Sequence, residues 1–300
     1  MDINALIQQS EQRRLEDLIE GWKVDWDNKR ISDERNTYEY LELERFGDWY
    51  KVITNSWVGF IFPNLQGVYK VRKEKRDYAI VENNEVRIIN FKTAKISDAY
   101  DDIEKHSIFR DGEVLAFEAR EGDKRRVVIL SKNEAKSELF DKVWIVGIEN
   151  NLVAFIRKNK ENYKVVLFDG KNKMESEQHE LVYALETGFK HGVVYYTTKD
   201  EDKERVIKFN GVQEKKSSLY DKIELLWGLK IVSGVVGFVA KEGEKQKAVL
   251  FDGEKEVESL RLYDEIKLSN IFQEGNKIIM EFYGAKNDLW IKDSIEYELS

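Results

Sequence analysis

Short hydrophobic stretches separated by turn residues occupy most of the chain, and apolar and polar positions alternate within them with a period of two. Residues 223–262 show the pattern clearly, with such stretches at 223–232, 235–240, 248–251 and 257–262. The stretches are separated by Ser233-Gly234, by the charged segment 241–245 and by Asp252-Gly253. Four short β-rich stretches joined by turn residues predict a four-stranded antiparallel meander.

A motif of an aromatic residue, Asp, any residue and then Ile or Val repeats along the chain. Its clear copies begin at Tyr100, Phe140, Tyr220 and Tyr263. Weaker copies are Trp49-Tyr50-Lys51-Val52, which opens the series, and Val182-Tyr183-Ala184-Leu185, which falls where the spacing requires one. The starts lie about 40 residues apart, which is typical of a structural repeat. The spacing predicts six units, starting near residues 49, 100, 140, 182, 220 and 263.

The turn residues support the same division of the chain. Phe168-Asp169-Gly170, Phe209-Asn210-Gly211 and Phe251-Asp252-Gly253 occupy the same place in three successive units, between the third and fourth stretches. Glu82-Asn83-Asn84 and Lys132-Asn133 stand at the corresponding place in the first two units. Asp-Gly and Asn-Gly pairs predict type I′ hairpin turns, because such turns need a positive φ at both central residues.

Units of about 40 residues with four strands each are the signature of a β-propeller. Over residues 49–300 the sequence resembles six-bladed β-propeller repeat proteins, and it is similar to the WG-repeat type in the Tyr-Asp-x-Ile step and the glycine-containing strand pairs. The Trp-Gly pair that defines WG repeats is not in register, so no specific family is identified. The sequence predicts an all-β fold: a closed six-bladed propeller of four-stranded antiparallel blades, preceded by a short N-terminal α-helix.

Residues 1–48 have a different pattern. Leu6, Leu15, Leu18 and Trp22 recur at helical spacing and predict an amphipathic helix from about residue 3 to about residue 20. We expect these side chains to pack on the propeller rim or to dock in a groove of a partner. Residues 23–36 are predicted to be a loop. Two segments compete to complete the last blade: residues 38–43, which alternate like a strand, and residues 295–299.

The composition excludes several kinds of chemistry. The chain has no cysteine, which excludes disulfides, cysteine-ligated metal centres and thiolate nucleophiles. The three histidines, His106, His179 and His191, are interpreted as ordinary surface or turn residues. No phosphate-binding glycine loop, apolar stretch of membrane-spanning length or secretory signal is found. We therefore expect a cytoplasmic protein with no metal, no cofactor and no membrane partner.

Carboxylates are the one plentiful group with catalytic potential. Asp101, Asp141, Asp221 and Asp264 repeat around the predicted ring, and glycosidases use pairs of carboxylates. A residue repeated in every unit favours a repeated structural role, such as accepting backbone N–H groups at the step from one blade to the next. The aromatic residue beside each Asp is expected to wedge between blades. The repeat therefore favours a non-enzymatic role and leaves enzymatic activity an open alternative.

Charge is unevenly distributed along the chain. The loops predicted between second and third strands carry more basic than acidic residues, although the chain has a net charge of −8, and residues 1–48 are acidic. One interpretation is a face that meets an anionic partner, and the other is a solvated rim of Lys- and Glu-rich hairpins. The candidate binding residues are Arg72, Lys73, Arg125, Arg126, Arg157, Lys158, Lys245 and Lys247.

The function predicted from these features is a non-enzymatic scaffold that binds a protein partner through one face of the propeller. A nucleic acid is the alternative partner for the basic loops. Two other functions stay open: a carbohydrate-active or other hydrolytic propeller that uses channel carboxylates, and a structural component of a phage or virus particle.

Overall fold

A computed structural model describes the backbone of residues 23–25, 28, 30–32, 37–39, 42–46, 49–53, 58–62, 65–75, 77–83, 85–93, 95–183, 188–224, 230–287 and 289–299. The chain divides into two compact units. The first comprises residues 1–106, 119–121 and 130–134, and the second comprises residues 107–118, 122–129 and 135–300. The predicted N-terminal helix, with Leu6, Leu15, Leu18 and Trp22, lies outside the described residues. In the part of the chain that is described, no helix is long and apolar enough to cross a membrane.

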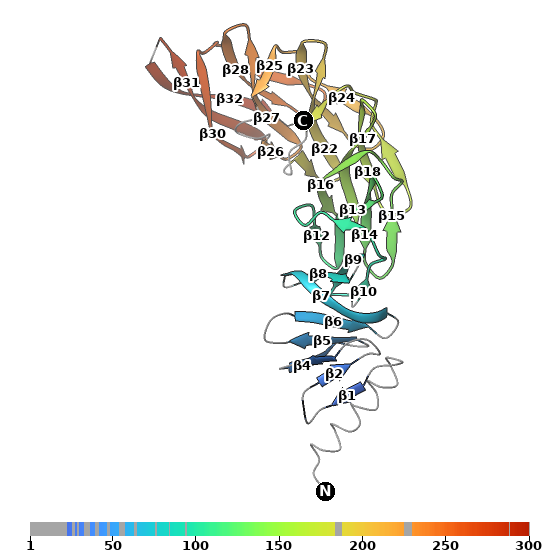
Figure 1. The fold of residues 1–300 in the computed structure, drawn as a ribbon. Helices are drawn as coiled ribbons and strands as arrows, with labels where there is room; N and C mark the ends of the chain where they lie inside the picture. Colours follow the sequence, from blue (N-terminus) through green and yellow to red (C-terminus); the bar gives the residue numbers. More distant parts are fainter. Residues whose placement is uncertain are drawn as a thin grey trace. The chain divides into compact units, whose positions relative to one another are not determined.

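Two antiparallel sheets form the N-terminal part of the chain (Figure 1). A three-stranded sheet contains β1 (Lys23–Asp25), β2 (Arg30–Ser32) and β3 (Thr37–Glu39). A seven-stranded sheet runs in the order β10-β9-β8-β7-β6-β5-β4, and its strands are β4 (Glu42–Phe46), β5 (Trp49–Ile53), β6 (Val58–Phe62), β7 (Leu65–Lys75), β8 (Tyr78–Asn83), β9 (Glu85–Asn90) and β10 (Lys95–Ile96).

This arrangement corrects two of the sequence predictions, of which the first is the loop at residues 23–36, because that segment contains β1 and β2. Of residues 38–43, the described ones belong to β3, which pairs with β2, and to β4, which pairs with β5. Completion of the last blade by this segment stays a prediction. The turn at 83–85 joins a second to a third strand, rather than a third to a fourth, since β9 is the strand whose Val86 forms a bridge with Tyr100. Arg72 and Lys73 therefore lie within the first strand of this repeat and not in a loop between second and third strands.

From residue 102 onward the chain forms five successive antiparallel sheets, which we call blades (Figure 1). Their strands are β11 (Asp102–Ile103), β12 (Phe109–Asp111), β13 (Val114–Glu121), β14 (Lys124–Leu130) and β15 (Glu134–Lys136); β16 (Lys142–Glu149), β17 (Leu152–Asn159), β18 (Asn162–Phe168) and β19 (Lys173–Glu175); β20 (Val182–Tyr183), β21 (Phe189–Lys190), β22 (Val193–Asp200), β23 (Lys203–Phe209) and β24 (Glu214–Lys216); β25 (Lys222–Glu224), β26 (Lys230–Val232), β27 (Val235–Glu242), β28 (Lys245–Phe251) and β29 (Glu256–Glu258); and β30 (Glu265–Glu274), β31 (Lys277–Lys286) and β32 (Leu289–Glu298).

The first four of these blades follow the predicted four-stranded meander, with the first strand broken into two short pieces in three of them. The last blade has three strands in the order β30-β31-β32, and residues 295–298 extend its third strand. The all-β repeat of antiparallel blades is thus confirmed. Closure into a ring and the number of six blades stay predictions.

Neighbouring blades of the second unit share hydrophobic cores, which explains the unbroken apolar character of their inner strands. Along β17, Val153 and Phe155 pack into the core shared with the preceding blade. Ala154 and Ile156, on the opposite face of the same strand, pack into the core shared with the following blade. Two similar cores join the β20–β24 blade to the β25–β29 blade and the β25–β29 blade to β30–β32. Each inner strand is therefore buried on both faces.

The Asp-Gly and Asn-Gly pairs form hairpins of a different kind from the type I′ turns that were predicted. Positive φ is found at Gly170, Gly211 and Gly253 but not at the preceding Asp or Asn. In the first of these turns the Asp169 carboxylate accepts the N–H groups of Lys171 and Asn172, at 2.8 and 2.7 Å, and closes a four-residue loop. Type I′ geometry, with two successive positive φ angles, occurs instead between first and second strands, at Asn150-Asn151, His191-Gly192 and Ser233-Gly234.

Candidate functional site

The segments that lead from one blade to the next carry most of the polar contacts between blades. We call them crossing segments; each begins at a serine and ends at an acidic residue, and they are residues 97–101, 137–141, 176–180, 217–221 and 259–264. The residue with the aromatic ring, which stands directly before the acidic residue, forms a backbone bridge to the third strand of the preceding sheet. The bridged pairs are Val86 with Tyr100, Arg125 with Phe140, Tyr163 with His179, Glu204 with Tyr220, and Gln246 with Tyr263.

The third ring of this series is His179, three residues before the copy that was placed at Val182. The sequence prediction placed the motif at an apolar residue, Val182. This residue belongs instead to β20, the first strand of the following blade. His179 is 8% exposed, so the interpretation of this histidine as a surface or turn residue was wrong. His191 does lie in a turn, with its Nδ1 3.7 Å from Glu149 Oε1, and His106 follows β11.

A serine at the start of each crossing segment was missed by the sequence analysis. Its Oγ accepts a backbone N–H from the preceding third strand at 2.9 to 3.2 Å in all five segments. The same Oγ donates to a carbonyl one or two residues later. The serine thus accepts a hydrogen bond from a third-strand N–H group that has no backbone carbonyl as its acceptor at this position. Its signal was available, since Ser stands three residues before the ring in four copies and four residues before Tyr263.

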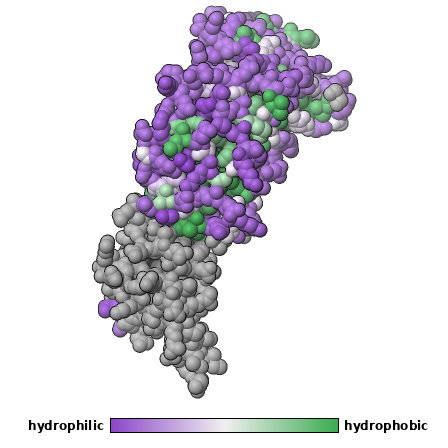
Figure 2. All heavy atoms as spheres, turned by 90° about the vertical axis from the view of Figure 1, so that its right-hand side faces the viewer, coloured by the Kyte–Doolittle hydropathy of each residue, from purple (hydrophilic) through white to green (hydrophobic). Residues whose placement is uncertain are grey.

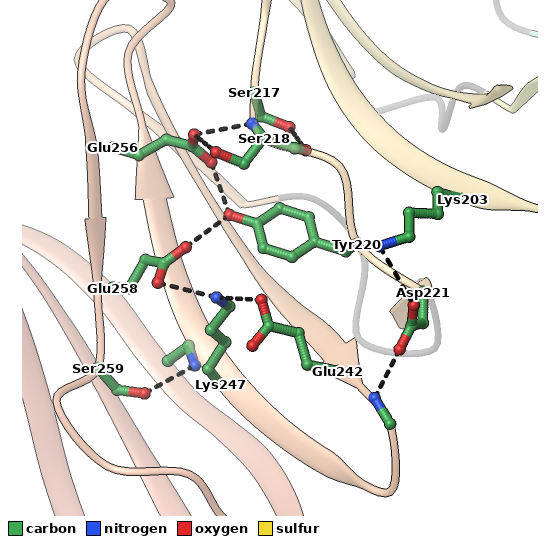
Figure 3. A network of polar contacts seen from close by, with 12 residues as sticks. Lys203, Ser217, Ser218, Tyr220, Asp221, Glu242, Lys247, Glu256, Glu258 and Ser259 are labelled. Atoms are coloured by element: carbon green, nitrogen blue, oxygen red, sulfur yellow. Dashed lines mark hydrogen bonds and ion pairs between the residues drawn. The ribbon is translucent and has the colours of Figure 1, made fainter.

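The polar end of each ring meets the fourth strand of the following blade. Tyr100 Oη donates to Glu134 in this way, and His179 Nε2 lies 2.9 Å from Glu214 Oε1. Figure 3 shows the contact at Tyr220, whose hydroxyl lies 2.7 Å from Glu256 Oε1 and 2.9 Å from Glu258 Oε1. Glu134, Glu214 and Glu256 are each the first residue of their strand. In the three-stranded last blade Asp293 of β32 accepts from Tyr263 instead.

Phe140 has no hydroxyl group, and the strand that faces it starts with Lys173 rather than Glu. Arg157 stacks over the Phe140 ring and binds Glu175 with its Nε and Nη2 at 3.0 and 3.1 Å. Burial alone would raise the pKa of Glu175, but its hydrogen bonds to Arg157 and Lys164 and the charge of Lys173 lower this pKa to about 2. The fourth strand therefore begins with Glu where the ring of the crossing segment is Tyr or His, and with Lys where the ring is that of Phe140.

The contact at His179 is buried on both sides. Glu214 Oε1 accepts from Tyr196 Oη at 2.6 Å and from the Glu177 backbone N–H at 2.9 Å, in addition to its contact with His179. The His179 and Glu214 side chains are 6% and 2% exposed. Burial would raise the pKa of Glu214, but these hydrogen bonds and the Lys216 charge lower it. Because solvent hardly reaches the cluster, its geometry serves a contact between blades rather than a reaction.

The motif aspartates fasten the crossing segments to the turns between second and third strands. Asp141, Asp221 and Asp264 accept backbone N–H groups from the turn of the following blade, at 2.5, 2.6 and 2.9 Å. Each also pairs with a lysine from the preceding blade, and these lysines are Lys124, Lys203 and Lys245. The hydrogen bond from its lysine is the main cause of the lowered pKa of Asp141 and of Asp264. These three carboxylates therefore have the structural role that the repeat predicted.

The candidate basic residues are spread over several blades and bind the chain's own acidic groups. Arg125 pairs with Glu118, Arg157 with Glu175, Lys158 with Glu161, and Lys245 with Asp264. Arg126 is half-buried and also interacts within the fold. The side chains of Arg72 and Lys73 lie outside the described residues. Arg125, Arg157, Lys158 and Lys245 are thus ion-paired within the fold, which reduces the field that they can present to an anion.

Lys247 is the most buried of these cations. Its Nζ lies 2.6 Å from Glu242 Oε1 and 2.8 Å from Glu258 Oε2, and 5.0 Å from the centre of the Tyr220 ring (Figure 3). Burial would lower the pKa of Lys247, but the two carboxylates outweigh it and raise this pKa. Among the described residues, no group of three or more His, Asp or Glu side chains is placed to hold a metal ion.

Comparisons with known proteins return weak structural similarities. No family model and no curated protein matches the chain. An uncharacterized protein from Listeria monocytogenes is similar, with a TM-score of 0.39, 14% identity and 91% of both chains covered. The β-propeller domain of the Trilobed protease from Pyrococcus furiosus gives a TM-score of 0.35 and 11% identity, over 93% of this chain and 90% of that one. An acylaminoacyl peptidase from Pyrococcus horikoshii gives 0.38 and 11%, over 88% of this chain and 55% of the peptidase. The chain also spans half the length of a prolyl endopeptidase that it matches.

Proposed function

We propose that the chain is a non-enzymatic interaction module that binds a protein partner through the face formed by its crossing segments. The observation that carries the proposal is a repeated exposure of apolar side chains on that face. Leu139, Leu219 and Leu262 each stand directly before the ring of a crossing segment, and they are 40%, 40% and 46% exposed. Trp144 and Tyr183, a few residues after two of the rings, are similarly exposed.

Exposed apolar side chains are ordinary when they are scattered, but a recurrence at one position of a repeat places them in a row on a rigid framework. Figure 2 shows apolar residues gathered in patches within a mostly hydrophilic surface of the described chain. The blades beneath the row are fixed by the serine, ring and aspartate contacts described above. A row of leucines on a fixed framework suits the apolar anchors of a protein partner.

The ion pairs favour a protein over a nucleic acid as the partner. Binding to phosphates draws its energy from cations that release counterions, and this requires cations that are not already neutralised. Arg125, Arg157, Lys245 and Lys247 each bind an acidic side chain of the chain itself. We therefore expect duplex and single-stranded oligonucleotides to bind weakly even at low salt.

The motif aspartates also weigh against a hydrolytic function for these groups. A general acid or nucleophile must be able to reach a substrate, whereas Asp141, Asp221 and Asp264 each bind a backbone N–H and a lysine. Substrate attack by these carboxylates would first require the contact between two blades to open.

The test replaces the row with charge. A triple variant, Leu139→Lys, Leu219→Lys and Leu262→Lys, should lose the proteins that cross-link to the wild-type chain in an extract of its native host. Val212→Lys is the control, since Val212 is 87% exposed in a turn between third and fourth strands. Circular dichroism and the thermal midpoint check that the fold is kept. The proposal fails if the triple variant cross-links to the same proteins as the wild type, or if the wild type cross-links to none.

A further inference from the structure

Within the described residues, the outer edge of the last blade has no counterpart of the strand that covers this edge in each preceding blade of the second unit. The last blade has the order β30-β31-β32, and none of the described residues pairs with the second edge of β32. In the blade before it, β29 and the crossing segment 259–264 lie along the corresponding edge of β28. A ten-residue strand with an uncovered edge is a template for pairing with another chain.

The register of β32 shows which of its backbone groups point toward this open edge. Leu299 donates its N–H to the Asn276 carbonyl at 2.8 Å, so the odd-numbered residues exchange hydrogen bonds with β31. The even-numbered residues, Trp290 and Lys292 among them, therefore direct their N–H and C=O groups outward. Along β32 these outward groups form the row that an added antiparallel strand would use.

The earlier blades show what fills the same positions. Gly243 and Asn287 occupy equivalent turns, because each donates its N–H to a motif aspartate, so Trp290 corresponds to Gln246 and Lys292 to Ala248. Gln246 exchanges two backbone hydrogen bonds with the ring residue Tyr263, at 2.7 and 2.9 Å. Ala248 donates its N–H to the crossing serine and accepts the N–H of that serine. The open positions on β32 thus match an aromatic residue opposite Trp290 and a serine opposite Lys292.

One position on β32 differs from the earlier blades in a way that bears on the partner. Lys124, Lys203 and Lys245 begin the third strands of three blades, and each pairs with the acidic residue that follows the ring. Leu289 stands at this position in the last blade and is 70% exposed. Trp290 and Ile291, next to it, are 45% and 40% exposed. An apolar residue therefore suits the place after the ring better than an acidic one.

The other half of β32 is guarded against pairing. Asp293 Oδ1 accepts the outward N–H of Ser294 at 2.8 Å, and Glu296 and Glu298 follow with exposed charges. Charged residues and capped N–H groups on an edge strand discourage pairing with other chains. Docking is thus confined to the half that begins at Leu289, where the Trp290 ring is held 4.3 Å from Lys267 Nζ.

We propose that residues 289–292 of β32 bind an extended segment of a partner protein with the pattern Ser-x-x-aromatic-apolar, added as an antiparallel strand. The aromatic residue of the segment exchanges backbone hydrogen bonds with Trp290, and its serine binds the Lys292 backbone. The apolar residue after the ring packs on Leu289. This edge is distinct from the row of leucines in the proposed function, so the two proposals can fail separately.

The test uses a labelled peptide with the sequence of residues 214–220 followed by leucine in place of Asp221, titrated against the full chain by fluorescence anisotropy. Lys292→Pro removes one outward N–H group of the edge and keeps the hydrogen bonds between β32 and β31. Proline is tolerated at such a position of an edge strand. Loss of one hydrogen bond should weaken peptide binding by up to about tenfold. Glu296→Pro removes an outward N–H in the guarded half and should leave the affinity unchanged.

Two further peptides test the pattern itself. A peptide that keeps the aspartate after the ring and a peptide with alanine in place of the serine should both bind more weakly than the first. Unfolding midpoints of the two proline variants show whether each is folded. The proposal is overturned if the first peptide does not bind at about 1 mM, the concentration at which even weak specific contacts register. It is equally overturned if the two proline variants bind the peptide alike, or if β32 is already covered by a segment of the chain and excludes it.

Discussion

The hydroxyl of Tyr220 offers the sharpest test of the contacts between blades. Tyr220→Phe removes one O–H group from a residue that is 1% exposed and keeps the ring in place. The hydroxyl lies within hydrogen-bond distance of Glu256 and Glu258. A hydrogen bond to a charged group contributes about 1.5–3 kcal/mol. Because Ser218 and Lys247 continue to bind these carboxylates, we expect the variant to lose about 1–2 kcal/mol of unfolding free energy.

Urea unfolding, followed by circular dichroism, measures this loss. Tyr283→Phe is the matched control, because Tyr283 is 45% exposed and its hydroxyl group is removed by the same substitution. Glu256→Gln and the double variant complete a cycle, in which the two changes should be coupled by about 0.5–3 kcal/mol, as expected for residues in direct contact. If Tyr220→Phe costs no more than Tyr283→Phe, or if the cycle shows no coupling, the contact does not hold the blades together.

Three further predictions concern the serine, the turns and the response to acid. Ser217→Ala should cost about 1–3 kcal/mol, because the buried Val206 N–H loses its acceptor; hydrogen exchange at the Val206 amide should become faster, and unchanged protection would contradict this. Gly211→Ala should lower the thermal midpoint more than Gly243→Ala, since both have positive φ but only at Gly211 would a Cβ meet the neighbouring blade, 2.7 Å from a methionine sulfur; equal midpoints would refute the packing argument. The pKa of Glu175 is lowered from 4.5 to about 2, so its contribution to stability is complete above its unfolded pKa and is lost as the pH falls from 4.5 toward 2; Glu175→Gln should flatten the urea midpoint over this interval, and a slope equal to that of the wild type would be evidence against the ion pair.

The repeat and its four-stranded units could be predicted because their signals are local. Alternation with period two and turn residues at fixed offsets depend on neighbouring positions only. The bridges at Tyr100, Phe140, Tyr220 and Tyr263 fall where the motif was recognised. His179 was missed because an apolar residue was expected at this position. Its imidazole occupies the position of the Tyr rings and contacts Glu214, the equivalent of Glu134 and Glu256.

The turn type and the roles of the charges could not be predicted, because they depend on what the backbone offers nearby. Asp169 could occupy a positive φ or accept hydrogen bonds from the N–H groups two and three residues later, and the sequence allows both. In the same way, Arg157 and Lys247 could point to solvent or inward. Their partners, Glu175 and Glu258, lie on the fourth strands of two blades. The number of residues between each cation and its partner does not reveal that they are in contact.

The match between each ring and the strand that it faces sets where the repeat can be cut. Removing residues 140–178 would join Leu139 to His179, and His179 would still face the Glu214 strand. Removing residues 142–181, a piece of almost the same length, would instead set Phe140 against Glu214. The buried Glu214 carboxylate would then lose its contacts with His179 and the Glu177 N–H and keep that with Tyr196. The portion of this chain that can be duplicated, deleted or exchanged is therefore a ring together with the blade that follows it, and not the blade by itself.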